Sequence, residues 1–261
     1  MSLIRLAWAF FRIGAMNDLQ YRVNFFVQVF QSGLALATGL VGLSLVFDHT
    51  STLGGWTRYE LLAVMGVHIL MGGLIRTAIQ PNMERLMADV QEGTLDYALT
   101  KPADSQTLVS VREVRIWQSV DIVMGSIILI FAVAQIQTGV GIGQALAFAS
   151  ALLLGALMIY CFWLMLTTGA FWVIRMENII ELFQGVYQAG RWPVGVYPDW
   201  LRTGLTFLVP VAFAVTVPAE AVTSRLTPNT LLGAALLAAL LMALTRFVWR
   251  RGLRRYSGAS A

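Results

Sequence analysis

Charged residues are scarce in this sequence. Asp, Glu, Lys and Arg make up only 12% of its 261 residues, whereas hydrophobic residues make up 57%. A soluble domain normally carries about 25% charged residues, so this chain has too little polar surface to face water on every side. We therefore expect lipid to be part of its solvent, and an ordinary soluble domain is excluded.

Lysine is almost missing, and its scarcity excludes one class of nucleotide site. The only lysine, Lys101, is followed by proline, whereas a P-loop needs G-x-x-x-x-G-K-[ST] to bring its lysine to the phosphates. No H-E-x-x-H or G-x-S-x-G motif occurs, and the two histidines, His49 and His68, stand about one membrane span apart. We expect no catalytic, cofactor-binding or metal site in this chain, so it is not expected to be an enzyme, and any work driven by ATP requires a partner.

The excess of positive charge is small, and cysteine is nearly absent. The formal net charge is +4, and the basic residues stand in short clusters between apolar runs. This distribution is typical of the loops of a membrane protein, so we expect no nucleic-acid partner. The single cysteine, Cys161, lies inside an apolar run and excludes an intrachain disulfide.

Long uncharged stretches define the expected membrane spans. A membrane helix needs about 20 mostly apolar residues. Between Asp121 and Arg175 there are 53 uncharged residues, which is enough for two spans, with a glycine-rich turn at 137–143 between them. Thr227 and Pro228 provide an N-cap and a first helical residue for the last span. The clear spans are expected at about 23–47, 59–79, 115–136, 144–172 and 229–249.

The two ends of the chain are both basic, and this sets the expected topology. The positive-inside rule places both ends in the cytoplasm, so the number of crossings should be even. Between 178 and 222 only one of two segments can then cross fully. We place the crossing at 178–192 and expect 193–223 to be a proline-broken re-entrant hairpin on the outer side. The opposite choice stays open, because it would move Arg191 and Arg202 to the inner side and fits the charge rule slightly better.

The first 22 residues are not expected to be a cleavable signal peptide, because charges recur through them. Arg5 and Arg12 fall on one helical stripe, while apolar residues lie away from it. This pattern indicates an amphipathic helix over 1–22 on the cytoplasmic face of the membrane, with a frayed leader as the alternative.

The longest polar interval between spans, residues 80–114, is expected to be cytoplasmic. Apolar residues at i, i+3, i+4 and i+7 predict a short amphipathic helix over 82–91, bracketed by Pro81 and Gly93. From this pattern alone, an interfacial connector and a docking surface for a soluble partner are both possible. The apolar face holds Met83, Leu86, Met87 and Val90, and the polar face holds Glu84, Arg85 and Asp89.

Several polar groups fall inside expected spans, where each needs a partner or a path lined with water. His68 is either hydrogen-bonded to a neighbouring helix or a substrate contact. Arg76 and Asp121 lie near the inner ends of spans two and three, and we expect them to form a structural ion pair. One polar face, pointing to a translocation path or a subunit interface, is formed by Glu181, Gln184 and Gln188.

One segment of the charged interval resembles a known family. Residues 93–102, GTLDYALTKP, look like the "G-x-L-D-x-x-L-x-x-P" segment of ABC-2 type permeases, the membrane subunits of ATP-binding-cassette exporters. Similar landmarks occur in order along nearly the whole chain. Each is weakly specific alone, but their order and spacing together are specific; they lie at 20–25, 55–60, 190–193, 197–201 and 249–259.

The resemblance implies a six-span permease whose coupling helix, between spans two and three, docks on a separate ATP-binding subunit. It implies that ATP and magnesium bind to that partner and that a second permease copy or a paralogous permease completes the transporter. The family resemblance does not depend on the amphipathic pattern. We therefore expect residues 82–102 to dock on the ATP-binding subunit rather than merely to connect spans two and three. The expected coupling residues are Glu84, Arg85, Asp89, Glu92, Gly93, Thr94, Leu95, Asp96, Tyr97 and Pro102.

We therefore expect an all-α membrane protein that forms one permease domain over residues 1–261. Its expected parts are six transmembrane helices, an N-terminal interfacial helix, a cytoplasmic coupling helix and an outer re-entrant hairpin. The expected place is the bacterial cytoplasmic (inner) membrane, with both termini in the cytoplasm, and the expected partners are the ATP-binding subunit, a second permease and membrane lipid. The alternatives are a self-sufficient secondary transporter and a membrane scaffold protein. Nothing in the sequence selects a substrate.

Overall fold

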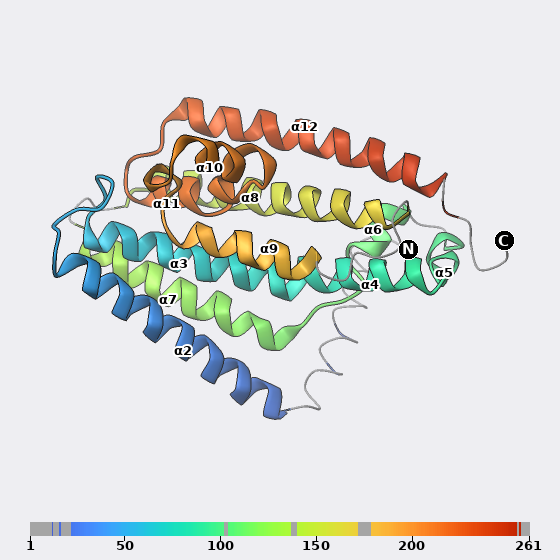
Figure 1. The fold of residues 1–261 in the computed structure, drawn as a ribbon, viewed down its shortest axis with the longest axis horizontal. Coiled ribbons are helices and arrows are strands. Elements are labelled where there is room, and N and C mark those ends of the chain that lie inside the picture. Colours follow the sequence, from blue (N-terminus) through green and yellow to red (C-terminus); the bar gives the residue numbers. More distant parts are fainter. Residues whose placement is uncertain are drawn as a thin grey trace.

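A computed structural model describes residues 12, 16, 22–101, 104–136, 140–171, 179–254 and 256, and in these ranges every regular element is a helix. The long helices run along the long axis of the molecule (Figure 1). Most of the helix expected at 1–22 and the expected coupling residue Pro102 lie outside the described residues. The long helices are α2 (Arg22–Phe47), α3 (Arg58–Leu74), α7 (Ser119–Gln135), α8 (Ile142–Thr168) and α12 (Pro228–Leu253).

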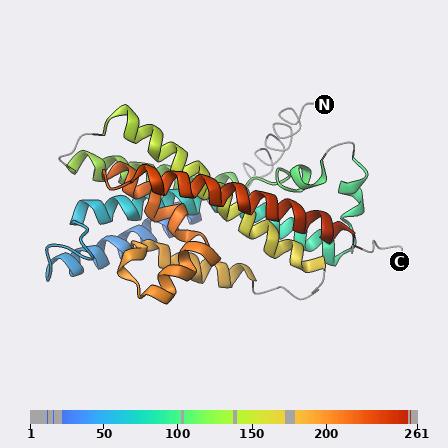
Figure 2. The same ribbon diagram turned by 90° about the horizontal axis from the view of Figure 1, so that it is seen from above.

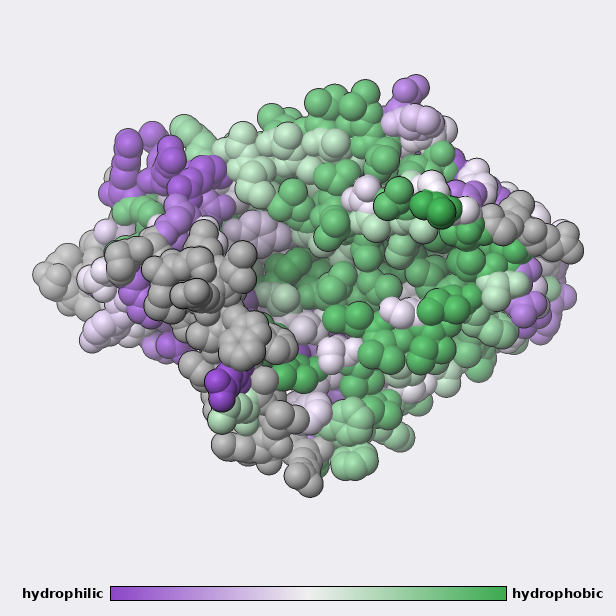
Figure 3. Space-filling view, turned by 180° about the vertical axis from the view of Figure 1, so that it is seen from behind, coloured by the Kyte–Doolittle hydropathy of each residue, from purple (hydrophilic) through white to green (hydrophobic). Residues whose placement is uncertain are grey.

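In the described part of the chain, five helical stretches are long and apolar enough to cross a membrane. Their bounds are Val23–Phe47, Arg58–Gln91, Ile116–Gln135, Ile142–Thr168 and Pro228–Leu253. Figure 3 shows a broad hydrophobic band across the middle of one face of the molecule, with hydrophilic side chains toward its two ends. The chain is therefore a multi-pass membrane protein.

The second span is longer than the sequence predicts. Helix α3 continues through the π-helix η1 (Ile75–Ile79) into α4 (Gln80–Gln91), so the expected span at 59–79 and the expected helix at 82–91 are one 34-residue helix. Proline inside a helix leaves the carbonyl four residues earlier without its N–H donor. That carbonyl belongs to Thr77, and the backbone N–H of Arg115 donates to it (3.0 Å). The helix expected at 82–91 is thus present as α4, with Pro81 in its first turn, but it continues α3 instead of standing apart from it.

The stretch between 179 and 222 is a series of short helices. Helix α9 (Ile179–Gln188) has ten residues, or about 15 Å at 1.5 Å per residue, against about 30 Å for the hydrocarbon core. The elements after it gather in one compact group away from α4 (Figure 2). Helices over Asp199–Leu208 and Ala212–Val222 bend by 79° around Pro210, as in a broken span or a re-entrant loop. The group consists of η4 (Ala189–Arg191), η5 (Val194–Val196), α10 (Asp199–Thr203), η6 (Gly204–Leu208), η7 (Ala212–Thr216) and α11 (Val217–Val222).

Helix α3 lies at the centre of the bundle, and glycines bring it into backbone contact with α7. A β-carbon added to Gly66 would lie 2.9 Å from the backbone nitrogen of Leu129. One added to Gly125 would lie 2.7 Å from the carbonyl oxygen of Gly66 and would also overlap the backbone of Leu70. Because lipid provides no hydrophobic drive between helices, such close packing is a main source of their association.

An ion pair ties the start of α3 to the loop before α12. The guanidinium of Arg225 donates from Nε and Nη2 to the two carboxylate oxygens of Glu60, both at 2.9 Å. It also donates to the carbonyl of Gly55 (2.8 Å) and lies over the ring of Trp56, 4.7 Å from its centroid. The last span then begins at Thr227, whose hydroxyl accepts the N–H of Thr230 (3.2 Å), as the capping pattern predicts.

The close contact of α3 with α7 predicts that Gly125→Ala destabilises the protein. The added methyl group has no space, and overpacking of this kind costs about 1–3 kcal/mol. Gly33→Ala in α2 is the matched control, since no atom lies within 4 Å of its β-carbon position. We expect a lower apparent Tm in nanodiscs for the first variant and an unchanged or higher one for the second; equal Tm values would contradict the contact.

Candidate coupling surface and membrane groove

One end of the bundle carries the short helices that follow the second span, and we call it the α5 end. Helices α5 (Asp96–Leu99) and α6 (Ser105–Val109) lie there with α4 and the last turns of α12 (Figure 1). The 3-10 helix η2 (Ile116–Gln118) leads from the loop after α6 into α7. This end contains the predicted coupling segment. Some residues of the segment are buried and hold its backbone in place, and others are exposed and could contact a partner.

The turn after α4 is built by three of the predicted coupling residues. Gly93 has φ +70°, a left-handed conformation that favours glycine, and the N–H groups of Thr94 and Leu95 both donate to the carbonyl of Asp89 (2.9 and 3.2 Å). The Leu95 side chain is fully buried. Gly93, Thr94 and Leu95 therefore shape this end and offer little surface to a partner.

The side chain of Asp89 is buried, contrary to the prediction. It was expected on the exposed polar face of the coupling helix, but only 2% of it is exposed. Its carboxylate pairs with Arg112 (2.5 Å) and Arg85 (3.1 Å) and accepts the hydroxyl of Thr94 (3.2 Å). Arg112 comes from the loop that returns to span three and covers this face, so Asp89 locks the segment together instead of docking.

The returning loop is bound along α4. Asn82 is buried, and its Oδ1 accepts the N–H groups of Arg112 (2.7 Å) and Glu113 (2.9 Å), while its Nδ2 donates to the carbonyl of Glu113 (2.8 Å). Glu84 pairs with Arg115 and accepts the amide of Gln80 (2.6 Å). Sequence reasoning missed Asn82 and Arg112, because their partners lie about thirty residues away and no local pattern marks them.

A second clamp joins this end to the last span. Arg246 on α12 donates to both carboxylate oxygens of Asp104 (3.1 and 2.5 Å), which also caps α6 at the N–H of Thr107 (3.1 Å). The hydrogen bonds from Arg246 hold the pKa of Asp104 at about 2, against a partial opposing effect of burial. Since a lowered pKa favours the charged carboxylate, the clamp is intact above pH 4 and is lost only as the pH falls through about 2.

The exposed part of the predicted coupling segment is a small surface with polar, charged and aromatic side chains, which we call the α5 surface. Its centre is Tyr97, with 77% of its area exposed, and Asp96 beside it is partly exposed. Of the predicted coupling residues, Arg85 and Glu92 are also exposed. The α5 surface consists of Arg85, Glu92, Asp96, Tyr97, Thr100 and Lys101.

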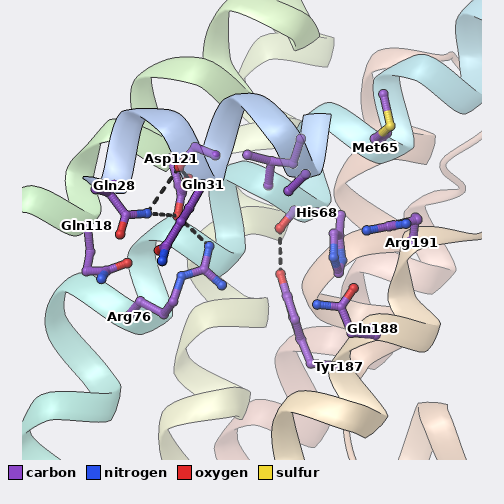
Figure 4. Close-up of a pocket in the computed structure, with 13 residues that line it drawn as sticks. Gln28, Gln31, Met65, His68, Arg76, Gln118, Asp121, Tyr187, Gln188 and Arg191 are labelled. Atoms are coloured by element: carbon purple, nitrogen blue, oxygen red, sulfur yellow. Dashed lines mark hydrogen bonds and ion pairs between the residues drawn. The ribbon is translucent and has the colours of Figure 1, made fainter. Parts of the chain in front are cut away.

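A polar groove of about 280 Å³ lies in the membrane part of the molecule, between α2, α3, α9 and the start of α7 (Figure 4). At one edge, Asp121 pairs with Arg76 (2.5 Å) and accepts hydrogen bonds from Ser32 and Gln28. The structure thus brings together the ion pair expected from the sequence. The groove is lined by Gln28, Gln31, Ser32, Ala35, Met65, His68, Ile69, Arg76, Gln118, Asp121, Tyr187, Gln188 and Arg191.

His68 lies near the middle of the membrane part. It is ten residues from the start of α3, about 15 Å and so about half the hydrocarbon core. Only 6% of it is exposed, its ring stacks on Tyr187 (centroids 4.6 Å apart), and the Tyr187 hydroxyl donates to its backbone carbonyl (2.8 Å). Its ring therefore contacts the neighbouring helix α9 by stacking, and it lines the groove as well.

Arg191 is the residue of the groove that sequence reasoning placed elsewhere. It was expected at the outer boundary, but it lines the groove and its guanidinium points toward His68 (Figure 4). A β-carbon on the adjacent Gly190 would lie 3.6 Å from His68 Nδ1, so the two residues are at one level. Charge at the middle of a bilayer costs about 2.5–3.5 kcal/mol on insertion scales, which makes such a residue a functional candidate.

The polar face expected on the weak fifth span is divided in the structure. Gln188 lines the groove, and Gln184 lines a smaller cavity of about 90 Å³ that shares Arg76, Tyr187 and Gln188 with it. Glu181 is exposed and lines neither cavity. The groove therefore includes Gln188, has Gln184 at its side, and excludes Glu181.

Comparison with known proteins gives one match. A family model described as "ABC-2 family transporter protein" matches residues 34–260, which include both the α5 surface and most of the groove. No curated protein and no solved structure matches the chain.

The buried position of Asp121 predicts an asymmetric double-mutant cycle. Arg76→Gln leaves a buried carboxylate without its cation, which is more costly than an ordinary surface pair and should lower stability by about 1–3 kcal/mol. Adding Asp121→Asn removes that charge while keeping an oxygen that Ser32 and Gln28 can bond. We therefore expect the double variant to have a higher apparent Tm than Arg76→Gln alone, and simple additivity of the two losses would argue against a coupled pair.

Proposed function

The chain belongs to the ABC-2 family of transporter proteins, and from this premise we propose that it is the permease subunit of an ABC-2 type exporter. In this proposal the chain forms the translocation path with a second copy or a paralogous permease. A separate ATP-binding subunit, which holds ATP and magnesium, docks on the α5 surface and drives the cycle.

The observation that carries the proposal is the continuous helix from Arg58 to Gln91. Its 34 residues correspond to about 50 Å at 1.5 Å per residue. One end supports the α5 surface, and the other lines the groove through Met65, His68 and Arg76. A helix is stiff along its axis, so a push at the α5 surface moves the wall of the groove directly.

The ion pairs of the α5 end support the same mechanism. Asp89 and Asn82 bind the returning loop to α4, and Asp104 binds α6 to Arg246 on α12. The indole of Trp249 also donates to the hydroxyl of Ser105 (3.3 Å). Motion applied to the α5 surface would therefore reach the second and the last spans together, rather than being absorbed in a flexible loop.

The charges favour an α5 end that faces the cytoplasm. Arg112, Arg115, Arg250 and Arg251 belong to that end, and the positive-inside rule places such clusters inside. On this orientation both termini are cytoplasmic and the protein lies in the bacterial inner membrane.

Because α9 alone covers only about 15 Å, we propose that the fifth crossing expected at 178–192 is completed by the turns after it, η4 and η5. The position of Val196 in η5 supports this, since a β-carbon on Gly54, in the loop between α2 and α3, would lie 3.0 Å from its side chain. The bent pair of helices Asp199–Leu208 and Ala212–Val222 is then the outer re-entrant element.

The groove supports a path that needs a second permease. Residues of α2 and of α9 both line it, and this polar lining is unsuited to contact with lipid. A second copy or a paralogue placed against α2 and α9 would shield it from lipid. The substrate would then cross between the two permeases.

The central place of Tyr97 predicts that Tyr97→Ala disrupts docking but not folding. Exposed aromatic residues are frequent hot spots, and losing one costs about 2 kcal/mol or more, so binding should weaken at least tenfold. The matched control is Trp200→Ala, because Trp200 is 75% exposed but lies away from the α5 surface.

The measurement is co-purification of the permease with a soluble P-loop ATPase, together with the ATPase rate of the complex. We expect loss of both with Tyr97→Ala, normal membrane insertion, and no change with Trp200→Ala. Retention of the ATPase by the Tyr97 variant would contradict the docking site. Transport by the purified chain alone under an ion gradient would instead support a secondary transporter.

A further inference from the structure

We propose that the membrane groove contains a subsite for an anionic group, centred on Arg191, and that the transported substrate is an amphiphile with a phosphate, carboxylate or sulfate head. This proposal rests on the function proposed above, since it names the class of molecule that the groove would accept.

The charges lining the groove are not balanced. Arg76 is paired with Asp121, and these two cancel. The remaining charged residue of the lining is Arg191, and no carboxylate in the described ranges pairs with it. A guanidinium in a membrane cavity attracts an anion strongly, because the local dielectric constant is low and its fork of N–H groups matches the oxygens of phosphate and carboxylate.

The only carboxylate in the lining does not oppose an incoming anion directly. Asp121 already accepts from Arg76, Ser32 and Gln28, and its side chain is 6% exposed. Arg76 uses Nη2 for that pair, and its side chain remains 34% exposed toward the groove. Asp121 therefore holds Arg76 in place while leaving part of its guanidinium open.

Neutral amides extend from the subsite toward the α5 end. Gln188 lies beside Arg191 and His68 (Figure 4). Gln28, Gln31 and Gln118 line both the groove and a second cavity that continues to Arg115. Amide N–H groups solvate an anionic head without repelling it. Such a track provides hydrogen bonds for a head that moves from the α5 end to Arg191.

The groove also has an apolar wall, and this favours an amphiphile over a small ion. Ala35, Met65 and Ile69 line the same cavity as Arg191. Outside it, α2 presents exposed hydrophobic side chains such as Phe26 and Phe30 to the membrane. A molecule with its head at Arg191 can keep its chain against this wall and the adjoining lipid.

The test is equilibrium binding of radiolabelled dodecyl phosphate to the full chain with its ATP-binding subunit in nanodiscs. Unlabelled dodecyl phosphate, dodecyltrimethylammonium, dodecyl maltoside and inorganic phosphate serve as competitors. We expect competition by dodecyl phosphate, and none by the cationic or the uncharged amphiphile. Competition by inorganic phosphate at similar concentration would also support the anion subsite, but would identify a soluble anion as the ligand class.

Three variants and one control assign the effect to Arg191. Arg191→Gln should weaken binding at least tenfold, and Arg191→Lys should restore part of it. Gln188→Glu, which places a carboxylate three residues from Arg191, should weaken binding to a similar degree without removing the guanidinium. Arg202→Gln is the control, because Arg202 pairs with the exposed Asp199 and does not line the groove.

The outcomes separate this proposal from the function on which it rests. Equal competition by cationic and anionic amphiphiles, or unchanged binding in Arg191→Gln, would overturn the anionic subsite even if the ATP-binding subunit remains bound. Charge-selective binding to a chain that retains no ATP-binding subunit would keep the subsite and overturn the exporter assignment.

Discussion

The unbroken helix from Arg58 to Gln91 is the feature on which the rest of the structure depends. It is continuous because the loop that returns to the third span supplies what Pro81 removes: the N–H of Arg115 bonds the carbonyl of Thr77. A helix that ended at Pro81 would make the α5 surface a separate hinged piece. With the helix intact, the same rigid element carries the surface for a partner and the wall of the groove.

Five of the seven ion pairs among the described residues join segments that are more than twenty residues apart in the sequence. Glu60 and Arg225 join α3 to the loop before α12, Asp104 and Arg246 join α6 to α12, and Asp89 and Arg112 close the α5 end. These charged residues are therefore explained by their role in holding distant segments of the fold together. Arg191 is different, because it has no such partner in the described ranges and lines the polar groove near the level of His68.

Much of the fold follows from the length of the uncharged stretches. The spans expected at 23–47 and 229–249 correspond to α2 (Arg22–Phe47) and α12 (Pro228–Leu253), since lipid leaves few alternatives to a helix of this length. The family was evident from ordered short motifs. The burial of Asp89 and the position of Arg191 were not predictable, because both depend on segments that come together only in the folded chain. Amphipathic spacing identifies the faces of a helix, but not what covers them.

The central claim is that the helix from Arg58 to Gln91 transmits motion from the α5 surface to the groove. The most direct measurement is the distance across the groove between spin labels at Gln31→Cys and Gln184→Cys, in the complex with its ATP-binding subunit, with and without ATP. The native cysteine, Cys161, is buried. We predict an ATP-dependent change in this distance, and its loss when two glycines are inserted after Ala78 to interrupt the helix. An equal change in the interrupted protein would contradict the account.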